Sequence, residues 1–209
     1  VQSAPHREDQ RLIYNGTCRG RFPDWDTATT VLPEGRLPVW RFKLDTQGTT
    51  SFYDEIKGEC FADYQADIGD FALARELNGA GYTFAHVVDD YLMGVTEVLR
   101  GDDLLEATHS HIILQNALGF PTPQYYHVPL VVAEDGRRLA KRHGDTRIGM
   151  LREKGFSARQ VIGVLAWWCG WAEFGEELSP EDLLPRFSWS TFNRESAVLT
   201  PQVKEFFKL

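Results

Sequence analysis

The chain has 209 residues, of which 43% are hydrophobic and 25% charged, and its formal net charge is −8. This composition is typical of a globular protein and excludes a disordered one. The acidic net charge argues against a protein that coats nucleic acid without sequence preference, although a local basic patch could still bind RNA. No apolar run reaches the roughly 18 residues that a membrane span needs, and we expect no signal peptide. The three cysteines, Cys18, Cys60 and Cys169, are too far apart for a disulfide framework and predict a reducing, cytoplasmic setting.

The first part of the chain has little helical pattern. Residues 1–11 are polar and predict a loop, and we expect a turn at Tyr14 and Cys18, because two candidate ligands do not make a tetrahedral zinc site. Residues 40–44 alternate between apolar and basic side chains and predict a strand. A turn at Gln47 and Gly48 would connect it to a return strand at 49–53.

A further short strand is predicted at residues 70–75. We interpret residues 1–78 as a loop-rich α+β module rather than part of a parallel sheet, with Cys60 buried in its packing.

The middle of the chain alternates between strand and helix signals. Residues 82–90 fit a helix of one or two turns, residues 94–100 a strand, and residues 125–132 a second strand. Between these strands, Asp102 or Asp103 is expected to cap a helix that ends at Gly119. Its apolar residues predict one buried face, and they are Leu104, Ala107, His111, Leu114 and Leu118. The result is a βαβ unit, the building block of nucleotide-binding sheets.

A cationic segment follows the second of these strands. Turn residues at 134–136 lead into a glycine-bracketed stretch with four fixed cations, Arg137, Arg138, Lys141 and Arg142. Such a loop can hold polyphosphate while negative charge develops, but charge alone also fits a solvated basic turn. Because ligands of open α/β sheets bind beyond the carboxyl ends of strands, Arg100 and this loop are expected on one rim.

The last part of the chain is predicted to be helical. Ser157 and Gln160 form a capping box, and Ser179 precedes a proline at the first helical position. The apolar stripe of the first helix would comprise Val161, Leu165, Trp168 and Cys169. We expect Trp167, Trp168 and Trp171 to pack rather than to stack on bases, because they accompany helical spacing.

Three motifs in order resemble the glutamyl-type class I aminoacyl-tRNA synthetases. The first is Tyr82-Thr-Phe-Ala-His86-Val-Val-Asp89-Asp90, and the second, Val98-Leu-Arg100-Gly-Asp-Asp103, places Arg100 18 positions after Tyr82. The third is Arg138-Leu139-Ala140-Lys141-Arg142, which resembles the KMSKS loop in its Lys-Leu-Ser-Lys-Arg form. Arg138 and Ala140 depart from that form, whereas its second lysine is kept as Lys141.

The resemblance implies a division of roles. Tyr82 and Arg100 would hold the substrate glutamate, and His86, on the same helical face as Tyr82, would line the pocket or simply pack there. Residues 138–142 would form the ATP-binding loop, with Lys141 as the catalytic cation on the phosphates of ATP and its Mg²⁺. Asp89 and Asp90 are expected to be structural caps without chemistry.

Within this family, the pair Tyr14 and Cys18 resembles the second half of a zinc site in the glutamyl-queuosine tRNA(Asp) synthetases. Those enzymes lack an anticodon-binding domain, and the chain ends too soon after the cationic loop for one of ordinary size. The resemblance therefore implies glutamate activation and transfer to the queuosine base of tRNA(Asp). The alternatives are a fragment of an ordinary glutamyl-tRNA synthetase acting on tRNA(Glu), and a non-catalytic glutamate- or RNA-binding relative.

The expected fold is α/β: the C-terminal half of a Rossmann-type nucleotide-binding domain with an α+β insertion and a helical C-terminal region. Residues 1–78 would be the insertion or acceptor-binding module, 79–148 the second half of the catalytic domain, and 149–209 a stem-contact-like region. The first signature motif and the other two zinc ligands of the family are absent. We therefore expect the isolated chain to be inactive without an N-terminal segment of the same enzyme.

Overall fold

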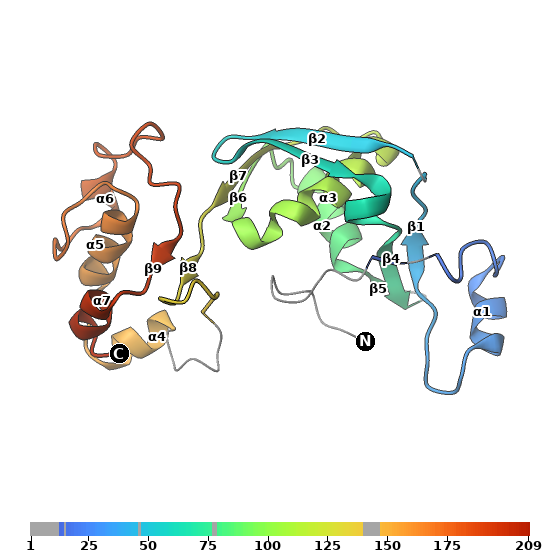
Figure 1. The fold of residues 1–209 in the computed structure, drawn as a ribbon, viewed down its shortest axis with the longest axis horizontal. Helices are drawn as coiled ribbons and strands as arrows, with labels where there is room; N and C mark the ends of the chain where they lie inside the picture. The colour runs from blue at the N-terminus through green and yellow to red at the C-terminus, as the bar shows by residue number, and fades with distance from the viewer. Residues whose placement is uncertain (1–12, 15, 46, 77–78, 140–146) are drawn as a thin grey trace. The chain divides into compact units, whose positions relative to one another are not determined.

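The computed structural model describes residues 13–14, 16–45, 47–76, 79–139 and 147–209. The predicted loop at residues 1–11 lies outside these ranges. The chain forms two compact units, residues 1–127 and 128–209, which are coloured from blue to green-yellow and from yellow to red in Figure 1.

The first unit is a mixture of helices and short strands. In chain order its elements are α1 (Trp25–Val31), β1 (Trp40–Phe42), β2 (Thr49–Asp54), β3 (Gly58–Asp63), the π-helical turn η1 (Tyr64–Ile68), β4 (Phe71–Glu76), β5 (Gly79–Ala80), α2 (Tyr82–Leu92), β6 (Glu97–Gly101), the 3₁₀ turn η2 (Asp102–Leu104), α3 (Leu105–Leu118) and β7 (Gln124–Val128). The strand predicted at 125–132 is thus interrupted, since β8 (Val131–Val132) is a separate element after Pro129.

The strands of this unit form two sheets. A four-stranded sheet has the order β3-β2-β7-β6, in which β2 is antiparallel to β3 and parallel to β7. The prediction that residues 1–78 stand apart from a parallel sheet is therefore wrong for β2, which pairs in parallel with β7. The remaining strands form a three-stranded sheet with the order β1-β4-β5.

The strands predicted around Gln47 and Gly48 exist, but they do not pair with each other. β1 pairs with β4, and β2 pairs with β3. The physical reason lies in side-chain packing, because Phe42 of β1 stacks on Phe71 of β4 with ring centroids 5.2 Å apart. A contact between residues so distant in sequence leaves no local pattern.

Helix α3 is more deeply buried than its sequence pattern indicated. Every side chain from Thr108 to Gln115 is buried, whereas Leu118, assigned to the predicted apolar face, is 40% exposed. The helix packs against α2 and β2, which lie on either side of it in Figure 1. Gly119 ends α3 in the left-handed conformation, as predicted.

The predicted cap at the start of α3 is wrong. Asp102 and Asp103 lie in the preceding 3₁₀ turn, and within the described ranges no side chain caps α3. The Asp102 carboxylate instead pairs with the Lys57 ammonium at 3.0 Å, so its partner comes from the β2–β3 turn.

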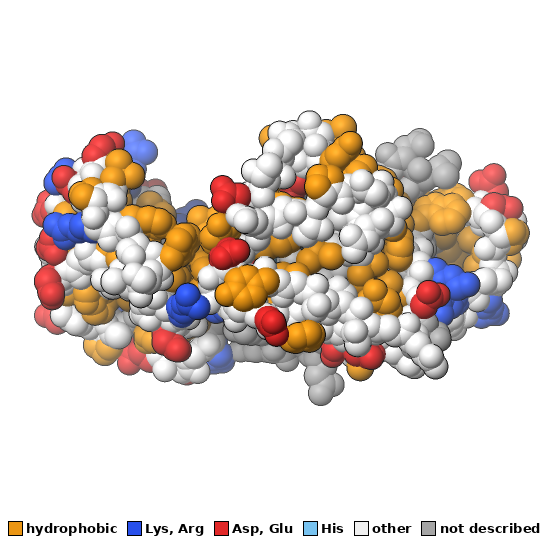
Figure 2. Space-filling model, turned by 90° about the horizontal axis from the view of Figure 1, so that it is seen from above, with side chains coloured by type: hydrophobic (Ala, Val, Ile, Leu, Met, Phe, Trp, Pro, Cys, Tyr) orange, Lys and Arg blue, Asp and Glu red, His pale blue; other side chains and the backbone are white. Residues whose placement is uncertain are grey.

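The core of the first unit joins both sheets to α2 and α3. Its buried members are Leu44, Ala62, Ile68, Phe71, Val87, Ile113 and Leu114. The outer side of the β2–β3 hairpin is less covered: Tyr53 is 62% and Phe61 70% exposed. Figure 2, viewed from above Figure 1, shows hydrophobic side chains on this surface.

The second unit is helical, with one small parallel sheet of β8 and β9. Its remaining elements are α4 (Ile148–Glu153), α5 (Ala158–Trp168), α6 (Pro180–Leu183), β9 (Ala197–Val198) and α7 (Pro201–Phe206). The predicted capping box at Ser157 and the predicted start at Ser179 and Pro180 are both confirmed.

The stripe predicted along α5 is partly wrong. Leu165 is 42% exposed, while Val164 and Ala166 are each 1% exposed and face the core. The core of the second unit comprises Met150, Leu151, Val164, Leu199, Val203 and Phe207. Trp167 and Trp168 pack against this core, as predicted, and Cys169 is only partly buried.

No helix in the described ranges is long and apolar enough to cross a bilayer.

Candidate functional site

Arg100 is the centre of a polar cluster inside the first unit. It stands near the end of β6, and its guanidinium meets side chains from α2, α3 and β7. Nε donates to Nε2 of His127 at 3.0 Å, and Nη2 donates to Oγ1 of Thr108 at 2.7 Å. Longer contacts join Nη1 to Nε2 of His86 at 3.2 Å and to Nδ1 of His111 at 3.4 Å.

The contacts with three histidines fix the charge pattern of this cluster. A guanidinium has only donors, so a ring nitrogen that forms a hydrogen bond with it must accept and is then unprotonated. Burial, followed by the charge of Arg100, lowers the pKa of His111 to about 3. Burial and Arg100 also lower the pKa of His86, although Asp90 opposes the shift. The result is a cation among neutral acceptors, with the pKa of Arg100 lowered by burial.

Behind His127 lies a buried carboxylate. Oδ2 of Asp54 is 2.6 Å from Nδ1 of His127, and both side chains are 0% exposed. Oδ1 of Asp54 accepts from the backbone N–H groups of Ile56 and Lys57 at 3.0 and 2.9 Å. Burial alone would raise the pKa of Asp54, but the hydrogen bonds from His127 and the two backbone groups outweigh it and lower the pKa.

The accessible side of the cluster is formed by α2. Tyr82 and His86 are one helical turn apart and share a face, as predicted, and their rings stack with centroids 5.6 Å apart. Tyr82 is 60% exposed, whereas His86 is partly buried. The structure therefore brings together Tyr82, His86 and Arg100, the three residues predicted to bind glutamate, although their roles stay predictions.

Asp90 does not act as the predicted cap. Its Oδ2 lies 3.2 Å from Nε2 of His86, the same nitrogen that faces Arg100. Nε2 of His86 thus lies between a donor, Nη1 of Arg100, and an acceptor, Oδ2 of Asp90, and Oδ2 of Asp90 is buried without a hydrogen-bond partner among the described residues. The chain thus places an unsatisfied carboxylate oxygen beside the cluster.

The start of the predicted ATP loop belongs to the second unit and is well anchored. The turn predicted at 134–136 is confirmed, with Gly136 at a φ of +78° and Arg137 paired with Asp135 at 2.6 Å. Arg138 bridges to Val132, and Leu139 packs against the second core. Ala140, Lys141 and Arg142 lie outside the described residues, so the role of Lys141 stays a prediction.

Tyr14 and Cys18 are in contact, but this contact does not test the predicted half zinc site. The Cys18 backbone N–H donates to the Tyr14 hydroxyl at 2.6 Å, and Cys18 is exposed. The pKa of Tyr14 is raised, first by burial and also by the Cys18 side chain, so a metal would have to displace the phenolic proton. Within the described ranges, no group of three or more His, Cys, Asp or Glu side chains could hold a metal.

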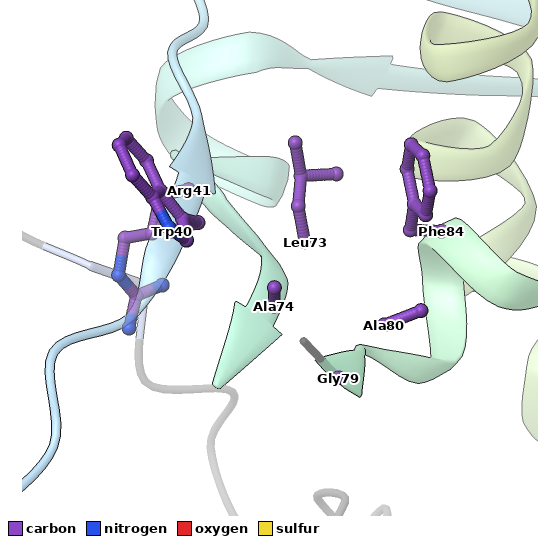
Figure 3. Close-up of a pocket in the computed structure, with 7 residues that line it drawn as sticks. All are labelled: Trp40, Arg41, Leu73, Ala74, Gly79, Ala80 and Phe84. Atoms are coloured by element: carbon purple, nitrogen blue, oxygen red, sulfur yellow. The ribbon is translucent and has the colours of Figure 1, made fainter. Parts of the chain in front are cut away.

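A separate pocket of about 340 Å³ lies between β1, β4, β5 and α2. Figure 3 shows Trp40 and Arg41 on one side and Phe84 on the other, with Gly79 and Ala80 at the base. It shares no lining residue with the Arg100 cluster. Arg41 is the charged residue of the lining, and its guanidinium carbon Cζ lies 4.1 Å from the centre of the Tyr14 ring. We assign the pocket no role.

A family model described as the catalytic domain of class I tRNA synthetases (E and Q) matches residues 8–187. The chain belongs to this family. Its fold agrees with that assignment: a crystal structure of a glutamate tRNA ligase from Elizabethkingia meningosepticum superposes with a TM-score of 0.68 at 23% identity, over 81% of this chain and 37% of that one. The predicted α/β class I synthetase fold is confirmed.

Curated relatives of this chain carry two different names. A glutamyl-Q tRNA(Asp) synthetase of Symbiobacterium thermophilum is 41% identical over 93% of this chain and 59% of its own length. A glutamate–tRNA ligase of Natranaerobius thermophilus is 42% identical over 79% of this chain and 34% of its own length. The chain thus spans less than two thirds of either relative, and the two similarities do not separate the substrates.

Sequence reasoning missed the residues that surround Arg100 from behind. Asp54, Thr108 and His127 come from three elements, and none was assigned a role. His127 alternates with Tyr125 along a strand, and Asp54 ends a strand, but each signal is ordinary by itself. Their meeting depends on the parallel pairing of β2 with β7.

Proposed function

We propose that the protein containing this chain activates glutamate with ATP and transfers it to a tRNA. The observation that carries the proposal is the guanidinium of Arg100, held from behind by His127 and Thr108 and bordered by Tyr82 and His86. Across the described ranges, its hydrogen bonds go to ring nitrogens, a hydroxyl and a backbone carbonyl, so a substrate carboxylate would be its first direct anionic partner.

The chemistry of this cluster suits glutamate. A planar guanidinium can pair with the γ-carboxylate through two parallel hydrogen bonds, and the long contacts of Nη1 with His86 and His111 are the ones to be replaced. Glutamine would present an amide N–H₂ group to a donor and would bind poorly. The Tyr82 hydroxyl would add an oriented hydrogen bond.

We assign ATP binding to residues 138–142, with Lys141 stabilising the negative charge that develops when glutamate attacks the α-phosphorus and pyrophosphate leaves. Mg²⁺ would accompany ATP. The anchoring of Arg138 and Leu139 on the second unit supports this assignment, because a phosphate-gripping loop needs fixed ends. The N-terminal part of such an enzyme would supply the remaining substrate contacts, so we expect the isolated chain to be inactive.

For the acceptor we propose the queuosine base of tRNA(Asp). The contact between Tyr14 and Cys18 supports this choice, because the queuosine enzymes are the members of the family that this pair resembles. We propose that residues 1–78 contact the RNA acceptor, residues 79–148 complete the catalytic domain, and residues 149–209 contact the RNA stem. The alternative is charging of tRNA(Glu), as the name of the Natranaerobius thermophilus relative states for that protein.

A non-catalytic role is the second alternative, and it has one specific observation in its favour. The loop carries Arg138 and Ala140 where the family's form has lysine and serine. A glutamate- or RNA-binding relative would keep the Arg100 cluster and lose the nucleotide chemistry.

Three measurements on the full-length protein separate these possibilities. Glutamate-dependent exchange between ATP and pyrophosphate, absent with glutamine, is expected for the enzyme, and no exchange would support the non-catalytic role. Labelled glutamate should then appear on tRNA(Asp) that carries queuosine and not on tRNA(Asp) without it. Label on tRNA(Glu) would reject the queuosine assignment in favour of the ordinary synthetase.

A further inference from the structure

Asp54 has no direct contact with Arg100, yet it determines which proton His127 carries. The carboxylate at 2.6 Å from Nδ1 requires a proton on that nitrogen, because two acceptors would repel each other. In the neutral ring, Nε2 is then a bare acceptor. That acceptor is the atom that receives the hydrogen bond from Nε of Arg100 at 3.0 Å.

The chain Asp54–His127–Arg100 also places a carboxylate one residue away from the guanidinium, in addition to the nearby charges of Asp90 and Asp103. Asp54 and His127 are each 0% exposed, and a buried cation without an anion nearby is costly. The negative charge therefore reaches Arg100 through a neutral ring rather than by direct contact. This leaves the Nη1 side of the guanidinium, which faces His86, without a competing carboxylate from Asp54.

We infer that Asp54 is a positioning residue that, through His127, holds the guanidinium of Arg100 in the orientation that receives the side-chain carboxylate of the amino-acid substrate. The inference rests on the proposed function for the identity of that substrate. Asp54 itself stays remote from the ligand, and its own contacts are with Ile56, Lys57 and His127.

Asp54→Asn tests the inference with almost no change in shape. The three backbone N–H groups at Oδ1 require the amide oxygen there, so the amide N–H₂ group takes the position of Oδ2 and faces Nδ1. Nδ1 must then be the acceptor, and the ring proton moves to Nε2, where it meets the Nε–H of Arg100. In glutamate-dependent exchange by the full-length protein, KM for glutamate should rise about tenfold or more, because a hydrogen bond to a charged group is lost. KM for ATP should change less than about twofold, since the fold is kept.

A second substitution separates positioning from a structural role. In His127→Gln, the side-chain oxygen can accept from Arg100 at the place of Nε2, and it needs no carboxylate to keep it an acceptor. Asp54→Asn should therefore have little effect on KM for glutamate in the His127→Gln background. Asp70→Asn is the matched control, because this largely buried carboxylate pairs with Arg19 at 2.9 Å and lies outside the Arg100 cluster. It should leave KM for glutamate unchanged.

Histidine ¹⁵N spectra give a readout that needs no activity. His127 should carry its proton on Nδ1 in the unsubstituted protein and on Nε2 in Asp54→Asn, with a displaced Arg100 Nε resonance. A proton on Nε2 in the unsubstituted protein would overturn the inference, even if Asp54→Asn fails to fold. Three kinetic results would also overturn the inference. In Asp54→Asn, KM for glutamate could stay unchanged, or the KM values for glutamate and ATP could rise equally. The third result is that Asp54→Asn still raises KM for glutamate in the His127→Gln background. An unsubstituted protein without exchange activity would reject the proposed function, and the spectra alone would then decide whether Asp54 positions Arg100.

Discussion

At the scale of single residues, Arg100 combines burial with direct hydrogen-bond partners that are not carboxylates, an arrangement that costs stability unless a ligand offsets it. The planar fork of its guanidinium is what the proposed recognition requires. Arg100→Lys keeps the charge but removes the donor at Nε and the paired donors at Nη1 and Nη2. We expect KM for glutamate to rise about 10- to 100-fold in glutamate-dependent exchange by the full-length protein.

The control for this substitution is Arg159→Lys. Arg159 is an exposed arginine that pairs with Asp182 at 2.9 Å, and its replacement should leave the exchange reaction unchanged. Equal glutamate affinity in Arg100→Lys and the unsubstituted protein would remove Arg100 from the proposed binding site.

His111 provides a prediction on the pH dependence of stability. Its pKa is about 3 in the folded protein, against an ordinary value of 6.5, because burial and the charge of Arg100 disfavour the imidazolium. The unfolded chain therefore binds a proton below pH 6.5 that the folded protein does not, and stability falls as the pH decreases through this range. His111→Gln removes this titration.

Urea unfolding at about pH 7.5 and about pH 5.5 measures the effect of His111. We compare the free energy of unfolding of His111→Gln with that of the unsubstituted protein at each pH. This difference should shift by about 1.4 kcal/mol in favour of His111→Gln between the higher and the lower pH. The comparison between two proteins cancels the titration of other groups. Parallel pH profiles for the two proteins would show that His111 is not held neutral by its surroundings.

At the scale of elements, Gly163 determines how α5 fits its surroundings. A Cβ on this residue would overlap the carbonyl oxygen of Glu176, which belongs to the segment that crosses the helix. Gly163→Ala should therefore destabilise the protein by about 2 kcal/mol, despite the better helix propensity of alanine. Gly149→Ala in α4 is the matched control, because a Cβ there would meet no described atom within 4 Å. It should be neutral or slightly stabilising in thermal unfolding, and equal effects of the two substitutions would disprove the close approach at Gly163.

Local signals predicted several element boundaries, and long-range pairing explains errors in how the strands combine. The cap at Ser157, the helix start at Ser179 and the helix end at Gly119 each depend on a few adjacent residues, and all three are confirmed. The pairing of β1 with β4 and of β2 with β7 joins distant segments, so residue alternation could place the strands but could not choose their partners.

The residues of the candidate site also fall into those that a local pattern predicted and those that only long-range pairing brings together. Tyr82, His86 and Arg100 were predicted because they stand in motifs, and the helical spacing from Tyr82 to His86 is visible in the sequence. Asp54 and His127 are 73 positions apart and meet only because β2 lies beside β7. Residues that act through another residue have no motif of their own.

At the scale of the whole molecule, the cysteines differ in what surrounds them. Cys18 is exposed and touches Tyr14, whereas Cys60 is partly buried with its thiol 3.5 Å from the carbonyl oxygen of Gly58. Burial raises the pKa of both Cys60 and Cys169, which makes them poor thiolates. Of the three, Cys18 is therefore the one suited to hold a metal.

The proposed zinc site can be tested by metal content. A structural zinc takes four ligands, and Tyr14 and Cys18 would be two of them, with the others from outside the described residues. We expect about one zinc per full-length molecule, most of it lost in Cys18→Ser, because a structural site tolerates few missing ligands. Cys60→Ser is the matched control and should retain the metal. Full zinc occupancy in Cys18→Ser, or none in the unsubstituted protein, would reject the half site at Tyr14 and Cys18, and with it the feature that favours queuosine tRNA(Asp) over tRNA(Glu).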